Sequence, residues 1–410
     1  MSARGRCLCL TLGALALAVT PTALRFTQAV AILAKLTGAP LPAALERRCL
    51  HPDIAEEVVS VHLDSADVRA RRYVARDARD GVARPLPGIL LLHGIHAQGI
   101  KEPRLVDFAR ALARAGLDVL TPELVDLTAF RVDPRSVDEI RGLAAAHAQS
   151  THTAAVGVVG ISFAGGLALL AAAQQAAPAP IGWVATVGAY DDLLRLARYY
   201  AGEPVRGPAG EPALVAPHPY GARVMLREQL AQLVPADDLP IAERALDSYL
   251  HDRPREAQHL TKLLSPAGRQ VMTTVLAHGP PDAQLADMLA RVVPLQSPRL
   301  MAASPHGHLA SLRVPVFLLH GAYDPIIPSF ETAYLAREIP AHYLRAVVVT
   351  KLLRHAEFPE SFALTDAYQL VRFMQRLLEA AHAAMVVAPG QPSARSLHTL
   401  AVQHVGENEP

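Results

Sequence analysis

One serine lies in a short run of small residues between an apolar stretch and a helical stretch. The run reads Gly160-Ile161-Ser162-Phe163-Ala164-Gly165-Gly166. A sharp turn from strand to helix, called a nucleophile elbow, holds a serine hydroxyl out at the carboxyl edge of a sheet. It requires small neighbours because the strand and the helix come close together. We therefore predict Ser162 as a nucleophile, with Gly160 and Ala164 supporting the turn. Ala164 stands where the commonest form of the motif has glycine, and a glycine-rich turn with an incidental serine is the alternative.

Two further residues complete a possible catalytic set. Asp324 and His355 each follow a late apolar run, which gives the chain order Ser, Asp, His of a hydrolase triad. His355 would take the Ser162 proton and pass it to the leaving group. Asp324 would fix the imidazole tautomer and stabilise its charge. Asp324 alone could cap a turn and His355 alone could be a surface histidine, and Asp191 or Asp192 is an alternative position for the acid.

A third motif precedes the first long helix. His93 and Gly94 end an apolar run, and the residues after them could aim backbone N–H groups at a negatively charged tetrahedral intermediate. We expect Ile95 to supply one donor of this oxyanion hole, with His96 as the alternative, and Phe163 to supply the other. His93 itself is expected to brace the loop.

The segments around these residues alternate between short apolar runs and helical periods. Such alternation predicts an α/β fold with a mostly parallel sheet covered on both faces. Residues 58–63 and 68–74 precede it and predict an antiparallel hairpin. The predicted strands are 89–92, 118–120, 156–159, 181–187, 314–319 and 344–350, and the predicted helices are 104–115, 136–149, 163–177, 330–339 and 360–383.

The alternation stops after residue 190 and resumes near residue 311. Residues 191–310 are rich in Pro, Arg and Leu, with helical pieces at 223–233 and 284–292. We interpret them as an inserted, mainly helical lid between two parts of one core, 56–190 and 311–384, because the later strands alone would form too small a core. The insertion interrupts the carboxyl edge of the sheet, where such sheets bind ligands, so it should govern substrate choice.

The two ends of the chain differ from this core. Arg4 and Arg6 precede an apolar stretch at 7–19, which predicts that residues 1–23 are a secretory signal peptide or an uncleaved membrane anchor. Alanine-rich sequence that merely mimics a signal is the alternative. Residues 24–55 are expected to form a linker or docking helix, and residues 385–410 a disordered tail.

Composition excludes several classes of partner. The 39 Lys and Arg nearly balance the 38 Asp and Glu, so no strong field favours nucleic acid. No apolar run after the N-terminus reaches the about 18 residues of a membrane span. Outside the predicted signal, Cys49 is the one cysteine, so no intramolecular disulfide framework is expected. A small, largely uncharged ligand fits this composition best.

Over residues 56–384, apart from the insertion, the chain resembles the α/β-hydrolase superfamily. Its elbow looks like that of esterases, dienelactone-hydrolase-like proteins and prolyl-oligopeptidase-like catalytic domains. The resemblance implies a serine hydrolase that cleaves a small-molecule carboxylic ester through an acyl-enzyme intermediate, without a metal or organic cofactor. Ser162 in place of an elbow aspartate sets aside dehalogenase and epoxide-hydrolase chemistry. An acyltransferase or peptidase with the same triad, or a catalytically silent binding protein, remains an alternative.

Export can be tested with a reporter. We expect alkaline phosphatase fused after residue 50 to be active, because the basic and apolar N-terminal pattern should direct the chain out of the cytoplasm. Changing Leu15 and Leu17 to Arg should abolish that activity. An inactive native fusion, with the full-length protein in the cytosol, would show that the apolar segment is not an export signal.

Overall fold

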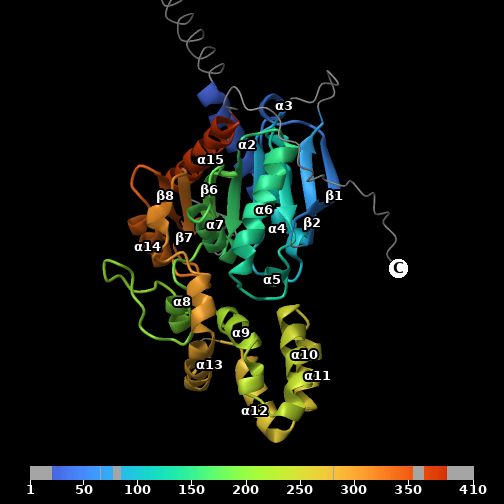
Figure 1. The fold of residues 1–410 in the computed structure, drawn as a ribbon, viewed down its shortest axis with the longest axis vertical. Helices are drawn as coiled ribbons and strands as arrows, with labels where there is room; N and C mark the ends of the chain where they lie inside the picture. The colour runs from blue at the N-terminus through green and yellow to red at the C-terminus, as the bar shows by residue number, and fades with distance from the viewer. Residues whose placement is uncertain (1–20, 65, 77–84, 280, 354–363, 386–410) are drawn as a thin grey trace, which may run out of the picture.

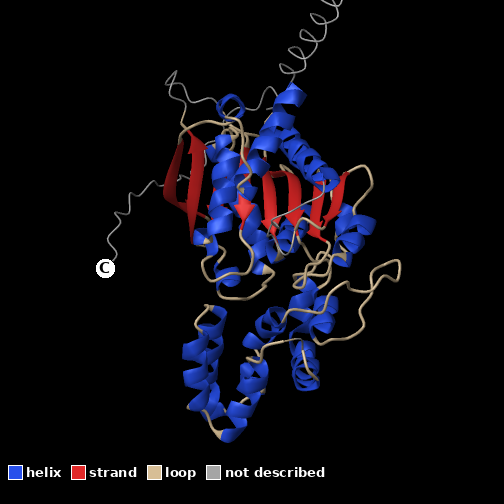
Figure 2. Ribbon diagram, turned by 180° about the vertical axis from the view of Figure 1, so that it is seen from behind, coloured by secondary structure: helices blue, strands red, loops and turns tan. Residues whose placement is uncertain are grey.

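The computed structural model describes residues 21–64, 66–76, 85–279, 281–353 and 364–385. One sheet with helices on both faces forms the body, and a group of helices lies beyond one end of the strands (Figures 1 and 2). The predicted α/β class with a mostly parallel sheet is therefore confirmed. His355, the predicted signal core at 7–19 and the tail from 386 onward lie outside the described residues.

The described sheet has eight strands in the spatial order β1-β2-β4-β3-β5-β6-β7-β8. The first two form the predicted antiparallel hairpin, β2 also pairs antiparallel with β4, and the remaining neighbours pair in parallel. The strands are β1 (Ile54–His62), β2 (Asp67–Ala75), β3 (Gly88–Leu92), β4 (Asp118–Pro122), β5 (Val156–Ile161), β6 (Ile181–Val187), β7 (Val316–Gly321) and β8 (Leu344–Thr350).

Central strands are buried on both faces, which explains their unbroken apolar sequence. In β3, Leu90 and Leu92 enter one core while Ile89 and Leu91 enter the other. Helices α6 (Arg135–Ser150), α7 (Phe163–Ala173) and α14 (Phe330–Glu338) cover the first face. Helices α2 (Pro21–Thr37), α4 (Pro103–Arg114) and α15 (Leu364–Ala384) cover the second. Helix α7 is four residues shorter than the predicted helix at 163–177.

Helix α2 belongs to the folded body. Ala29, Ala31 and Ile32 are fully buried against the second face, and the Gln28 amide donates to the Cys49 and Ala115 carbonyl oxygens at 3.3 and 3.1 Å. The segment 24–55, predicted as a linker or docking helix, thus contains most of α2, the short helix α3 (Ala43–Cys49) and the start of β1. No helix among the described residues combines the length and the apolar character of a membrane span.

The insertion, residues 191–310, lies beyond the carboxyl ends of the parallel strands (Figure 2). Its helices are α8 (Leu193–Tyr200), α9 (Pro219–Arg227), α10 (Leu239–Leu250), α11 (Pro254–Lys262), α12 (Pro266–Val275) and α13 (Ala283–Ala302). The predicted helix at 223–233 breaks after α9 into a separate 3-10 turn at Leu230–Gln232.

Helix α13 runs past its predicted end at residue 292. It contains Pro294 and Pro298, which each remove a backbone hydrogen bond. Tertiary contacts hold the last turns in place, because Leu300 is buried and the Gln296 amide donates to the Met225 carbonyl oxygen at 2.9 Å.

Strand β5 requires glycine at position 157. A Cβ there would lie 2.0 Å from the ring of Trp183, which is almost fully buried and packs edge-on against Phe317. We expect Gly157→Ala to lower the free energy of unfolding by about 1–3 kcal/mol through overpacking, measured by denaturant titration. Trp183→Leu should relieve the clash, so the double variant should lose less than the sum of the two single variants. Additive losses would contradict this explanation.

Candidate active site

Ser162 occupies a strained turn between β5 and α7. Its backbone has φ 55° and ψ −126°, a left-handed φ that non-glycine residues seldom adopt, and only 5% of the residue is exposed. The small neighbours are sterically necessary. A Cβ at Gly160 would lie 2.6 Å from the Gly165 Cα, and one at Gly165 would lie 2.8 Å from the Ala189 Cβ. The geometry is that of a nucleophile elbow.

The loop after β3 passes directly over this turn. A Cβ at Gly94 would lie 3.2 Å from the Ser162 Cβ, so only glycine fits without displacement. Ile95 and His96 follow, and both line the same cavity as Ser162. Phe163 is the first residue of α7, where backbone N–H groups have no partner within the helix. The structure thus places both predicted sources of oxyanion donors beside the serine.

His93 links two loops of the sheet edge. Its Nε2 accepts from the Leu124 N–H at 3.0 Å, and its Nδ1 lies 2.7 Å from the Gly94 carbonyl oxygen. Burial lowers the pKa of His93 to about 4, so the ring is neutral and Nδ1 carries the donated proton. The imidazole therefore holds the Gly94 loop against the loop after β4.

Asp324 follows β7 and is 1% exposed. Its Oδ1 accepts from the N–H groups of Ile326 and Ile327 at 2.8 and 3.0 Å, which fixes the orientation of the carboxylate. Its Oδ2 lies 3.6 Å from the His320 Nε2. The third predicted member, His355, lies outside the described residues, while Leu353, two positions earlier in the sequence, lines the cavity of Ser162.

The alternative acids lie in other surroundings. The carboxylate of Asp191 receives Arg195 at 2.7 Å and lies 2.9 Å from the Nδ1 of His306. Asp192 caps helix α8 by accepting from the Leu194 N–H at 2.8 Å. None of Asp191, Asp192 and Asp324 itself lines the cavity beside Ser162, but Ile326, whose N–H binds Asp324, does.

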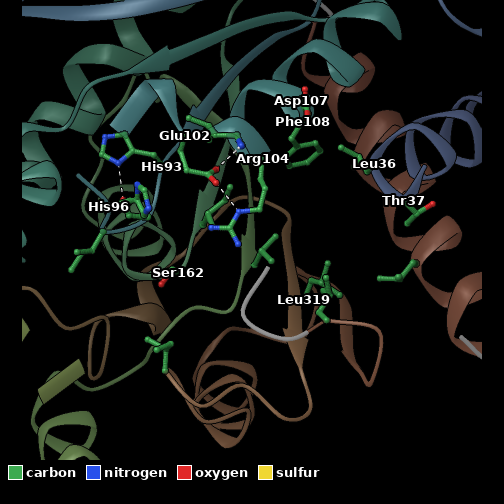
Figure 3. Close-up of a pocket in the computed structure, with 18 of the residues that line it drawn as sticks. Leu36, Thr37, His93, His96, Glu102, Arg104, Asp107, Phe108, Ser162 and Leu319 are labelled. Carbon is green, nitrogen blue, oxygen red and sulfur yellow. Dashed lines mark hydrogen bonds and ion pairs between the residues drawn. The ribbon is translucent and has the colours of Figure 1, made fainter. Parts of the chain in front are cut away.

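The cavity beside the serine has a volume of about 740 Å³. Cavities of 300–1,000 Å³ commonly hold small molecules. Figure 3 shows His93, His96 and Ser162 near one end, and Leu36, Thr37 and Phe108 away from them. The lining is mostly apolar, which suits a substrate that carries a hydrocarbon group.

Residues of the insertion also reach the site, and the sequence did not indicate them. The Tyr220 hydroxyl donates to the Ile95 carbonyl oxygen at 2.9 Å, and the His218 N–H donates to the Pro325 carbonyl oxygen at 2.8 Å. Two positions at the start of α9 thus contact the loop that contains Ile95 and the loop that contains Asp324. Because Tyr220 and Ile95 are 125 residues apart, no local pattern could have revealed their contact.

One group of described residues has the composition of a metal site. Asp191, His306 and Glu338 offer ligand atoms that lie within 4.8 Å of one another. However, the Arg195 guanidinium pairs with Asp191, and the Glu338 carboxylate accepts from two backbone N–H groups. These contacts explain the group without a cation.

The Tyr220 contact can be tested by removing one oxygen. We expect Tyr220→Phe to lower kcat about threefold to tenfold with little change in KM. The variant loses the hydrogen bond that holds the Ile95 backbone, so the Ile95 N–H is less well positioned for the oxyanion. Tyr199→Phe is the matched control, because that hydroxyl bonds to the Val215 carbonyl oxygen within the insertion. Equal losses in the two variants would show that Tyr220 does not position the oxyanion loop.

Comparison with known proteins gives distant matches. No family model and no curated protein sequence matches the chain. A puromycin hydrolase structure is 14% identical with a TM-score of 0.46, and the alignment covers 85% of this chain but 41% of that one, less than half of its length. A 2,6-dihydroxy-pseudo-oxynicotine hydrolase is 13% identical with a TM-score of 0.45, covering 82% of this chain and 70% of that one. A 2-hydroxy-6-oxo-6-phenylhexa-2,4-dienoate hydrolase from Rhodococcus is 18% identical with a TM-score of 0.39, covering 80% of this chain and 100% of that one.

These distant matches assign no activity to the chain, whose own geometry defines its fold. In the sheet, β1, β2 and β4 pair antiparallel, and the remaining neighbours pair in parallel. The spatial order departs from the chain order once, because β4 lies between β2 and β3. A serine stands at the turn from β5 to α7, and a helical insertion follows the next strand. The chain therefore has the α/β-hydrolase fold.

Proposed function

We propose that this protein is a serine hydrolase that cleaves a carboxylic ester through an acyl-enzyme intermediate. The observation that carries the proposal is the strained Ser162 turn, which opens on a mostly apolar cavity beneath the Gly94 loop. A left-handed serine is stabilised only by the packing around it, and such conformations occur at functional sites.

In the proposed mechanism, the Ser162 hydroxyl attacks the ester carbonyl carbon while His355 takes its proton. The tetrahedral oxyanion accepts hydrogen bonds from the backbone N–H groups of Ile95 and Phe163. His355 then protonates the leaving alcohol, and water repeats the sequence to release the acid. Asp324 holds the imidazole tautomer and stabilises its positive charge.

The choice of acid follows from the surroundings of the carboxylates. Two backbone N–H donors hold the Asp324 carboxylate. Asp324 follows β7, which pairs with β6, the first strand after the Ser162 turn. Asp191 already balances the buried charge of Arg195. Its Oδ2 receives both the Arg195 guanidinium and the His306 ring, at 2.7 and 2.9 Å.

Two further parts of the proposal concern the setting of the enzyme. We propose that the insertion acts as a lid, because Tyr220 from its α9 helix lines the cavity. We also propose that residues 1–23 direct export or membrane attachment, on the sequence pattern described above.

The nucleophile is tested by substitution and by covalent labelling. Ser162→Ala should abolish both turnover of p-nitrophenyl esters and labelling by a fluorophosphonate, since no other group forms the acyl-enzyme. Asp324→Asn should lower kcat about 10³–10⁴-fold, because the imidazole loses its oriented tautomer. Asp191→Asn is the matched comparison and should retain far more activity in folded protein.

Other results would redirect the proposal. If Ser162→Ala retains more than a few per cent of the activity, the nucleophile is elsewhere. If Asp191→Asn is the more damaging variant at equal folding, the acid must be reassigned. Labelled protein that turns over amides or transfers acyl groups, but hydrolyses no ester, would indicate a peptidase or an acyltransferase.

A further inference from the structure

The cavity does not end at the catalytic serine. It continues onto the second face of the sheet, between helices α2, α4 and α15, as a region that we name the apolar arm. The arm is lined by Leu33, Leu36, Phe108, Leu370, Phe373 and Met374.

One face of helix α2 forms a wall of the apolar arm. Ala29 and Ile32 are fully buried in the core, whereas Leu33 and Leu36 are only partly buried and line the arm. Helix α2 packs on both α15 and α4, so it closes the groove between them from outside. Figure 3 shows Leu36 and Phe108 on the side of the cavity away from His93 and His96.

Charged groups line the cavity at the entrance to the arm, where Figure 3 shows Glu102 and Arg104 between Ser162 and Leu36. Arg104 and Asp107, on the first turns of α4, are exposed, and Arg104 pairs with Glu102 at 2.6 Å. His218, Tyr220 and Asp252 of the insertion also line the cavity, and the Tyr220 hydroxyl bonds to the Ile95 carbonyl oxygen beside Ser162.

We propose that the apolar arm binds a long hydrocarbon chain attached to the carbonyl carbon of the ester, so that the substrate is a medium- or long-chain acyl ester. This inference rests on the proposed ester hydrolysis. The alcohol group must leave into water, which the polar side of the insertion suits, while the acyl chain stays bound to the serine through the intermediate. Each methylene buried in the arm should raise kcat/KM about threefold to fourfold until the arm is full.

The first experiment measures chain-length preference. In Leu36→Trp the indole should occupy the arm and lower the ratio of kcat/KM for p-nitrophenyl laurate to that for p-nitrophenyl acetate at least tenfold. Tyr368→Trp is the control: it lies on α15, is 58% exposed and does not line the cavity, so its ratio should match that of the wild type. Phe108→Ala, which enlarges the arm, should shift the preferred acyl length upward.

Esters that carry the hydrocarbon chain on the alcohol part test whether the arm binds the acyl chain or the alcohol chain. Alkyl acetates of increasing length should show a flat series in the wild type and in Leu36→Trp. If the alkyl acetates instead carry the length dependence, or if Leu36→Trp leaves the laurate-to-acetate ratio unchanged in folded protein, the proposal is overturned.

A binding measurement separates failure of the arm from failure of the proposed function. Calorimetry should detect laurate binding to Ser162→Ala, and adding Leu36→Trp should weaken it at least tenfold. Laurate binding without any ester turnover by the wild type would support the arm and contradict the hydrolase. Ester turnover without laurate binding would support the hydrolase and contradict the arm.

Discussion

The close approach of β5 and α7 at Ser162 is the constraint on which the rest of the site depends. Space at the turn is so limited that a Cβ at Gly160 or Gly165 would overlap its neighbours. The serine is thereby held at a positive φ, and its side chain is directed beyond the carboxyl edge of the sheet. Glycine at position 94 also lets its loop approach the serine closely, since a Cβ there would lie 3.2 Å from the Ser162 Cβ. Three glycines and one strained turn therefore define the position of the proposed nucleophile.

The insertion is fixed to the core by buried charge as well as by apolar packing. Arg195 of α8 pairs with Glu331 of α14 at 2.7 Å and with Asp191 at the same distance, and Glu331 is fully buried. The Arg195 guanidinium also stacks over the ring of Tyr334 at 3.7 Å. Removing Arg195 would leave the two buried carboxylates without their shared cation, at a cost of several kcal/mol. These contacts anchor the start of the insertion to α14, and from its α9 helix the Tyr220 hydroxyl bonds to the Ile95 carbonyl oxygen.

Helix α2 lines the part of the cavity that lies away from His93 and His96. Gln28 satisfies two carbonyl oxygens on α3 and beside α4, and this anchors α2 over the groove between α4 and α15. A typical buried groove between two such helices would be filled by their own side chains. Here the partly buried Leu33 and Leu36 leave a space that continues to Ser162. A segment far from the motifs in the sequence thus shapes the region in which we place the acyl chain.

Local sequence determined the elements that carry the chemistry. The apolar runs ending at Leu92, Val159 and Leu319 predicted buried strands because both faces of a parallel sheet exclude water, and the small residues around Ser162 predicted the elbow because only they fit that turn. The tertiary structure alone decided that Arg195 also pairs with Glu331, that Tyr220 reaches Ile95, and that α2 forms a wall of the cavity. Each of these depends on contacts between residues more than a hundred positions apart, whose side-chain packing no local periodicity encodes.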